Sequence, residues 1–301
     1  MSLDFKGRVA IVTGAGGGLG RQHALALAAR GARVVVNDLG GTVDGSGGSA
    51  TAAQKVVDEI RAAGGEAIAN AASVTDFPAV QAMVQQALDA WGRVDVLVSN
   101  AGVLRDKSFG KMDLADFRLV LDVHLMGAVH CCKALWPVMN EQKYGRIVLT
   151  TSSSGLYGNF GQANYGAAKM ALVGLMQTLA IEGLKNDVRI NCLAPTAVTR
   201  MTNALFPPDM LQAFGPEAVV PAMLVLAAQD APTRTMLCAG AGGFEAANIT
   251  LTQGEFIGIG PEAPERLHEH LDAVRDRRGE VVPASGAVQG ANELRLVRSR
   301  R

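Results

Sequence analysis

Short apolar runs alternate with amphipathic stretches along this chain, and the alternation predicts its secondary structure. Residues 9–13 (VAIVT) and 145–151 (GRIVLTT) are typical of buried strands, while residues 77–91 carry apolar side chains at helical spacing. Applied to the whole chain, the pattern predicts strands at 9–13, 33–38, 66–70, 94–98, 145–151 and 187–194, at least one more within 235–252, and helices at 50–63, 77–91, 113–140, from about 161 to 184, 217–229 and 262–275. Alternating strands and helices predict an α/β fold with a parallel sheet of about seven strands, doubly wound, with helices on both faces.

The chain has 301 residues, of which 49% are hydrophobic, enough for one large core. No repeat and no interdomain linker interrupts the pattern. We therefore expect residues 1–275 to form one domain. Residues 276–301 are polar and unpatterned, so we expect a mobile tail.

Charge and cysteine content limit the partners and the compartment. Acids and bases balance at 28 each, which argues against nucleic-acid or anionic-membrane binding. The four cysteines lack metal-ligand or disulfide spacing, so no metal is expected and a reducing compartment is favoured. We see no signal peptide, no apolar run near the ~20 residues of a membrane span, and no peroxisomal SKL-type address in the final VRSRR. These observations predict a cytoplasmic protein.

A glycine-rich turn follows the first strand and leads into a helix. The spacing Gly14-x-x-x-Gly18-x-Gly20, with the second strand ending on Asp38, is that of a dinucleotide-binding βαβ unit. Glycines let the backbone approach a pyrophosphate, and the helix start offers free N–H groups. Asp38 would accept hydrogen bonds from the adenosine ribose and repel a 2′-phosphate, which favours NAD over NADP.

A hydroxyl, a phenol and an ammonium follow the fifth strand. Ser152 stands directly after it, and Tyr165 and Lys169 lie four residues apart, one turn along a helix if the segment after residue 160 is helical. Lowering a phenol pKa by about three units takes about 4 kcal/mol, and an ammonium at ~4 Å in an effective dielectric of ~20 supplies about that much. This argument predicts that Lys169 keeps Tyr165 ionised as an acid/base; a surface Tyr and Lys on an ordinary helix is the alternative.

Other segments leave alternatives open. Asn100 follows the fourth strand with small neighbours, as a contact for a cofactor ring or as part of a plain loop. His124 lies in an apolar helix, where a lone histidine usually packs in the core.

Two loops and one helix also allow more than one interpretation. The composition of residues 40–50 favours a flexible connection over a flap. Residues 196–216 are rich in Met, Phe and Pro, which favours an apolar substrate lid over a surface loop. The helix ending near residue 184 is apolar nearly all round, which indicates burial on both sides or a subunit interface.

The motifs of this chain together resemble those of the short-chain dehydrogenase/reductase family over about residues 5–201. They are TGAGGGLG at 13–20, Asp38, NAG at 100–102, Ser152 and YGAAK at 165–169. The resemblance implies a seven-stranded doubly wound sheet, a nicotinamide cofactor, oxidoreductase activity, and dimers or tetramers.

A closer similarity is to the (3R)-hydroxyacyl-CoA dehydrogenase domain of the peroxisomal multifunctional enzymes, also called the 17β-hydroxysteroid dehydrogenase type 4 domain. The segments that carry it are VNDLGG, NAGVLRDKSF, DVHLMG, KYGRIV and GLYGNFGQANY. In such proteins hydratase and sterol-carrier domains follow, so this chain is expected to be a free-standing counterpart. The similarity fades after about residue 202.

The resemblance assigns catalysis to Ser152, Tyr165 and Lys169. His124 takes the position of an asparagine that completes a proton relay in many relatives, so it either relays protons or packs. Two departures concern the cofactor: Ser73 replaces an acid before Val74, and Pro195-Thr196 replaces Pro-Gly, with Thr199 displaced by one. The cofactor contacts implied are Gly14, Gly18, Leu19, Gly20, Asp38, Ser73, Val74, Asn100, Ala101, Gly102, Tyr165, Lys169 and Thr196.

Three functions are compatible with this sequence. The first is NAD-dependent oxidation of a (3R)-3-hydroxyacyl-CoA, the second is oxidation of a steroid or another secondary alcohol, and the third is a catalytically idle NAD-binding scaffold. The intact Ser152, Tyr165 and Lys169 argue against the scaffold. The expected partners are a small-molecule substrate and a second copy of the chain.

Overall fold

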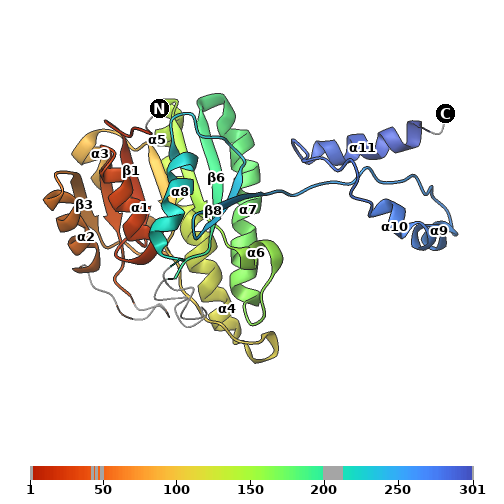
Figure 1. The fold of residues 1–301 in the computed structure, drawn as a ribbon, viewed down its shortest axis with the longest axis horizontal. Coiled ribbons are helices and arrows are strands. Elements are labelled where there is room, and N and C mark those ends of the chain that lie inside the picture. Colours follow the sequence, from red (N-terminus) through yellow and green to blue (C-terminus); the bar gives the residue numbers. More distant parts are fainter. Residues whose placement is uncertain (1–2, 42–43, 45–46, 48–50, 199–212, 300–301) are drawn as a thin grey trace. The chain divides into compact units, whose positions relative to one another are not determined.

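The computed structural model describes residues 3–41, 44, 47, 51–198 and 213–299 of the 301-residue chain. Within these residues, eight strands form one sheet in the order β3-β2-β1-β4-β5-β6-β7-β8 (Figure 1). The strands are β1 Val9–Thr13, β2 Arg33–Asn37, β3 Glu66–Asn70, β4 Val96–Ser99, β5 Gly145–Thr150, β6 Val188–Pro195, β7 Met236–Gly240 and β8 Gly243–Ala247. The predicted α/β class and parallel pairing are confirmed, with one strand more than about seven.

Helices cover both faces of the sheet. The helices α1 (Gly18–Ala28), α2 (Thr51–Ala62) and α8 (Val220–Ala227) pack together on one face, and their buried residues share a core with β1 and β2. The helices α3 (Phe77–Trp91), α5 (Gly127–Gln142) and α7 (Ala163–Gly183) belong to the other layer. The central strands β1 and β5 are buried at every position, which explains why their sequences are continuous apolar runs.

The long helix expected at 113–140 is interrupted. It consists of α4 (Leu114–Leu121), a π-helical turn at Asp122–Met126, and α5. Single π-turns inside a helix are frequent at functional sites, because the extra residue changes the direction of nearby side chains. The apolar periodicity predicted the helix but not this turn.

The eighth strand extends the sheet through a tight turn. Ala241 and Gly242 connect β7 to β8, with φ angles of +50° and +79°. A two-residue turn with both angles positive joins antiparallel strands, and it suits glycine at its second position. The edge strand β8 is therefore antiparallel, whereas β1 to β7 pair in parallel.

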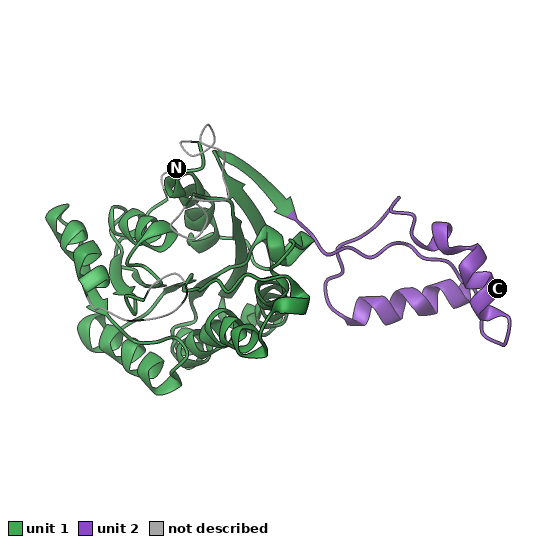
Figure 2. Cartoon of the chain, turned by 90° about the horizontal axis from the view of Figure 1, so that it is seen from below, with its two compact units in different colours: residues 1–246 green, residues 247–301 purple. Residues whose placement is uncertain are grey.

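The chain divides into two compact units, residues 1–246 and 247–301 (Figure 2). The second unit contains α9 (Ala263–Glu269), α10 (Leu271–Val274) and α11 (Ala287–Arg298). This division differs from the expected boundary at residue 275, and a helix occupies much of the stretch expected to be unpatterned. Among the described residues of this unit, no large apolar side chain is buried, so its helices do not pack around an apolar core.

Two helical stretches, Leu114–Gln142 and Ala163–Asn186, have the length and hydropathy of a membrane span. The expectation that no apolar stretch approaches that length is therefore wrong. Both stretches contribute to the core, and the second carries the buried cation Lys169. Packing within the fold explains their composition, because a helix covered on several sides needs apolar residues on each of them.

Candidate active site

The predicted site residues gather along one edge of the sheet. Gly14 follows β1, Asp38 follows β2, Asn100 follows β4 and Ser152 follows β5, so all four stand at carboxyl ends of parallel strands. The chain order reverses between β1 and β4, and ligands of doubly wound sheets bind in the crevice at this switch point.

The side chains of Ser152 and Tyr165 interact across the end of β5 and the start of α7. Ser152 is buried and caps the short helix α6 (Ser153–Tyr157), since its Oγ accepts a hydrogen bond from the backbone N–H of Ser154 at 3.2 Å. Tyr165 lies in the first turn of α7, which confirms the helix expected after residue 160. Burial raises the pKa of the phenol, and its interaction with Ser152 acts in the opposite direction. The two side chains can therefore bind one substrate oxygen together.

Lys169 lies one turn further along α7, with almost its whole side chain buried. Its Nζ donates a hydrogen bond to the carbonyl oxygen of Thr150 at 2.6 Å and lies 5.4 Å from the centre of the Tyr165 ring. Burial lowers the pKa of Lys169 to about 7. The backbone of Lys169 is held as well, because its carbonyl oxygen accepts a hydrogen bond from Thr151 Oγ1 at 2.7 Å.

The charge argument made from the sequence is not realised in this arrangement. Burial raises the pKa of Tyr165, the interaction with Ser152 opposes this without cancelling it, and the charge of Asp106 raises the pKa further. Lys169 does not offset burial, since its ammonium is bound to a carbonyl oxygen and burial reduces its own charge near neutral pH. The side chains come together as predicted, but the phenol is protonated at neutral pH.

His124 packs against Tyr165 from the π-helical turn. The two rings meet edge to face, with centroids 5.1 Å apart and an interplanar angle of 89°. His124 Nε2 lies 2.8 Å from the carbonyl oxygen of Val103, whereas its buried Nδ1 has no hydrogen-bond partner. Burial and then the charge of Lys169 lower the pKa of His124 well below its ordinary value. The imidazole is neutral at physiological pH.

The glycines of the first turn leave no room for side chains. A Cβ on Gly14 would lie 2.8 Å from the Ala101 Cα, and one on Gly20 would lie 2.2 Å from the Gly14 carbonyl oxygen. Gly14 also has a φ of +62°, which disfavours other residues. This close backbone approach next to the start of α1 is what a pyrophosphate site requires.

Asp38 lies beside this turn. Its carboxylate accepts hydrogen bonds from the backbone N–H of Gly16 at 2.7 Å and of Gly40 at 2.6 Å. A Cβ on Gly16 would lie 2.8 Å from the carboxylate carbon, so the turn and the acid fit each other. Asp38 therefore stands where the resemblance places the ribose-binding acid, and these residues fit a dinucleotide.

Asn100 ties the end of β4 to the turn after β1. Its Nδ2 donates to the carbonyl oxygens of Thr13 and Gly14 at 3.1 and 3.2 Å. Thr13 Oγ1 accepts hydrogen bonds from the backbone N–H groups of Asn100 and Ala101. A Cβ on Gly102 would lie 2.3 Å from the His124 ring, so this glycine is required for the position of His124.

Four further residues implied as cofactor contacts lie in different surroundings. Ser73 is bonded to Thr75 within its own turn, and the Val74 carbonyl oxygen lies 2.8 Å from His130 Nδ1. Leu19 packs on the core near the start of α1, and Thr196 is exposed after β6. Thr199 and most of the expected lid at 196–216 lie outside the described residues.

Sequence reasoning missed several residues that hold the site together. Thr151 binds the Lys169 carbonyl oxygen, and Gln162 and Asp106 are joined by a hydrogen bond of 2.7 Å beside Tyr165. The sequence offered one signal for Gln162, since it stands just before the first turn of the helix that carries Tyr165. Nothing in the local pattern singled out Asp106, because its role depends on a loop 56 residues away.

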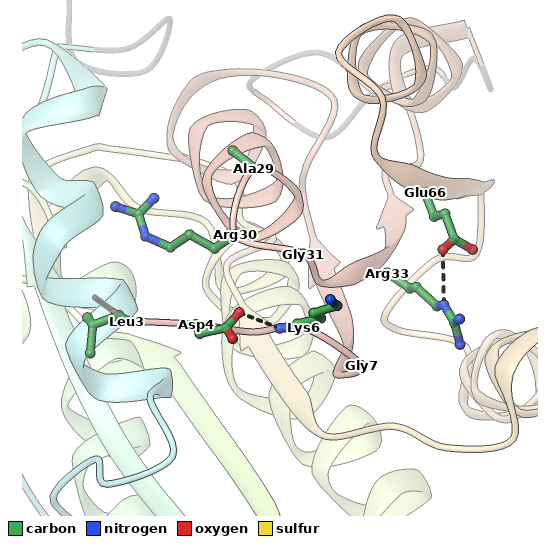
Figure 3. A pocket seen from close by; sticks show the side chains of 9 residues that line it. All are labelled: Leu3, Asp4, Lys6, Gly7, Ala29, Arg30, Gly31, Arg33 and Glu66. Atoms are coloured by element: carbon green, nitrogen blue, oxygen red, sulfur yellow. Dashed lines mark hydrogen bonds and ion pairs between the residues drawn. The ribbon is translucent and has the colours of Figure 1, made fainter. Parts of the chain in front are cut away.

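A hollow of about 910 Å³ lies at the opposite edge of the sheet (Figure 3). It is lined by residues that precede β1 and follow α1, and by the first residues of β2 and β3. Arg33 forms an ion pair with Glu66 there, and Asp4 accepts the backbone N–H of Lys6. Acids and bases are mixed, so the hollow has no distinct chemical preference, and it is remote from Tyr165.

Comparison with known proteins relates the chain to a family. A family model described as short chain dehydrogenase matches residues 8–209. The chain is 52% identical over 243 residues to a peroxisomal hydratase-dehydrogenase-epimerase of Saccharomyces cerevisiae, covering 81% of this chain and 27% of that protein.

Two solved structures are similar. Full-length peroxisomal multifunctional enzyme type 2 from Drosophila melanogaster matches with a TM-score of 0.81 at 36% identity, over 99% of this chain and 50% of that one. A 7α-hydroxysteroid dehydrogenase, solved with NADH and 7-oxo glycochenodeoxycholic acid, matches with a TM-score of 0.72 at 30% identity, over 80% of this chain and 95% of that one. The chain thus spans half or less of the multifunctional relatives described here.

Proposed function

Because this chain belongs to the short-chain dehydrogenase family and acts as a dehydrogenase on a CH–OH group, we propose that it oxidises a (3R)-3-hydroxyacyl-CoA to the 3-ketoacyl-CoA with NAD. The observation that carries the proposal is the Ser152–Tyr165 pair, placed at the sheet edge that also holds the glycine turn and Asp38. The similarity to a hydratase-dehydrogenase-epimerase supports the hydroxyacyl substrate.

The chain would bind and orient both reactants. The glycine turn of Gly14, Gly18 and Gly20 would accommodate the pyrophosphate. Asp38 would accept hydrogen bonds from the ribose hydroxyls, and its negative charge disfavours a 2′-phosphate. The nicotinamide ring, when bound, supplies the hydride acceptor. Ser152 would hold the substrate oxygen and Tyr165 would exchange a proton with it.

The protonation state of Tyr165 gives the reaction a pH dependence. The protonated phenol is ready to donate to a ketone, whereas oxidation needs the phenolate. Oxidation should therefore accelerate as pH rises, and reduction should be faster at lower pH. Lys169 would favour the phenolate most strongly when it is charged.

A steroid or another secondary alcohol is the second candidate substrate. It is supported by the similarity to a 7α-hydroxysteroid dehydrogenase solved with a 7-oxo bile acid. The deciding experiment measures NADH formation with a panel of (3R)- and (3S)-3-hydroxyacyl-CoAs and steroid alcohols. A kcat/KM at least tenfold higher for (3R)-thioesters supports the proposal, whereas a preference for steroids replaces it. No turnover of any substrate supports the idle scaffold.

We also propose a homo-oligomer and a cytoplasmic location. Met170, Ile181 and Leu184 are exposed on or just after α7, which supports an apolar contact between copies. The buried thiols Cys131, Cys132 and Cys192 are unpaired, in keeping with a reducing compartment. Light scattering after size exclusion tests the first proposal, and cell fractionation with an antibody tests the second.

A further inference from the structure

Gln162 is the centre of a hydrogen-bonded network next to the Ser152–Tyr165 pair. Its side chain is buried, and its Oε1 accepts hydrogen bonds from Ser154 Oγ at 2.7 Å and from Asn159 Nδ2 at 3.2 Å. Because the oxygen already accepts two donors, the amide nitrogen must point the other way. It donates to Asp106 Oδ2 at 2.7 Å.

The network reaches both residues of the pair. Ser154 N–H donates to Ser152 Oγ, and the Gln162 carbonyl oxygen accepts the Gly166 N–H at 2.7 Å in the first turn of α7. Tyr165 lies in that same turn. A displacement of Gln162 would therefore disturb both the serine and the tyrosine.

The loop that carries Asp106 is held to the same segment by two further bonds. Lys107 N–H donates to the Gly161 carbonyl oxygen at 2.9 Å, and Asn164 Nδ2 donates to the Arg105 carbonyl oxygen at 3.0 Å. Asn164 is fully buried. These bonds keep the Asp106 carboxylate close to the start of α7.

Within the part of the chain that the structure describes, Asp106 is the carboxylate whose charge acts on the phenol of Tyr165. The ring also lies near Lys169, with Nζ 5.4 Å from the ring centre, and near His124, which is neutral. Arg105 and Lys107 flank Asp106, but they pair with Asp113 and Asp116 instead. The charge of Asp106 acts against ionisation of the phenol.

We propose that Asp106 and Gln162 are positioning residues that align Tyr165 with Ser152 and place a negative charge beside the phenol. The pair thereby favours the proton-donating form of Tyr165 over the phenolate. This inference rests on the proposed function only in treating Tyr165 as the group that exchanges the proton.

Two variants should move the ionisation of Tyr165 in opposite directions. Asp106→Asn keeps an oxygen that accepts from Gln162 but removes the charge, so ionisation should occur at lower pH. Gln162→Glu keeps acceptors for Ser154 and Asn159, loses the amide that donates to Asp106, and adds a second carboxylate. At the alkaline pH of phenol ionisation both carboxylates are charged, so ionisation should occur at higher pH. Because Asp106 is exposed to solvent, which weakens its field, a shift of about half a pH unit is expected for each.

Asp113→Asn is the matched control. The substitution removes the same charge from a nearby segment. In the original protein, Asp113 pairs with Lys107 and has no hydrogen bond to Gln162. Its titration should coincide with that of the unchanged protein.

The chain has three tyrosines, Tyr144, Tyr157 and Tyr165, so tyrosinate absorbance can be assigned by subtracting the curve of Tyr165→Phe. This measurement needs no substrate; circular dichroism defines the pH range in which the fold is intact. The inference is overturned if Asp106→Asn titrates like Asp113→Asn, or if both test variants shift in the same direction. Opposite shifts support it even if no hydroxyacyl-CoA is turned over, in which case only the proposed function fails.

If Tyr165 ionises only at a pH at which the fold is lost, the pH dependence of kcat for alcohol oxidation and for ketone reduction is measured instead of the absorbance. Asp106→Asn should then shift the oxidation profile to lower pH with KM changed less than twofold. A profile identical to that of Asp113→Asn overturns the inference.

Discussion

The ammonium of Lys169 is bonded to the carbonyl oxygen of Thr150, 2.6 Å away at the end of β5. The lysine is therefore held between the strand that precedes Ser152 and the helix that carries Tyr165. Burial raises the pKa of the Tyr165 phenol, and Lys169 does not offset this although the two residues share a helix face. The same arrangement determines what several variants should do.

Tyr165→Phe should reduce turnover by at least about a thousandfold, because the substrate oxygen loses its proton donor and acceptor while Ser152 stays in place. The variant keeps the ring that packs on His124, so the fold should be unaffected. NADH fluorescence titration should give an unchanged Kd. Turnover within tenfold of the original protein would remove Tyr165 from the mechanism. Tyr157→Phe, at an exposed position on α6, is the control.

Asp38→Asn should weaken the preference for NAD over NADP by about tenfold or more, since the repulsion of a 2′-phosphate disappears. The asparagine oxygen can still accept one of the two backbone hydrogen bonds made by the carboxylate. The ratio of kcat/KM for the two cofactors measures the effect, and Asp58→Asn on the exposed side of α2 serves as control. An unchanged ratio contradicts the role of Asp38.

His124→Asn should lower kcat about tenfold without removing an ionisation from the pH profile. Burial keeps the imidazole neutral, so its contribution is to pack on Tyr165 and to bind the Val103 carbonyl oxygen. His130→Asn is a matched control, because His130 also binds a carbonyl oxygen but from α5. The loss of one pKa between about 5 and 8 in His124→Asn would instead indicate a proton relay.

His23 makes the first unit sensitive to acid. The side chain is fully buried in α1, neither ring nitrogen has a hydrogen-bond partner, and burial lowers its pKa from 6.5 to about 4. The folded protein thus binds fewer protons than the unfolded chain between these values. Stability is fully present above pH 6.5 and falls as pH decreases towards 4, by about 3 kcal/mol in total.

His23→Phe should abolish this acid-dependent loss. Urea unfolding followed by the fluorescence of Trp91 and Trp136, both in the first unit, measures it at several pH values. His268→Phe, exposed on α9, is the control. If His23→Phe retains the whole pH dependence, other groups are responsible for it.

The chain's hydrophobic pattern was enough to predict the strands β1 to β6 and the main helices between them. These features follow from local rules, because a buried parallel strand requires an apolar run and the carboxyl ends of such strands share one edge. The spacing of Tyr165 and Lys169 needed only the helical repeat, and the required smallness of Gly14 and Gly20 was visible as a motif. The resemblance to the short-chain dehydrogenase/reductase family is confirmed by a family match over residues 8–209.

What the pattern could not supply depends on contacts between distant segments. The bond from Lys169 to Thr150, the ring contact of His124 with Tyr165, and the link from Gln162 to Asp106 each join residues 19 to 56 positions apart or on different elements. Ionisation of the phenol depends on burial and on those neighbours, so the sequence placed Tyr165 in the site but only the tertiary structure decided its charge. The division after residue 246 has the same origin, since a boundary between compact units is set by which residues pack together rather than by local composition.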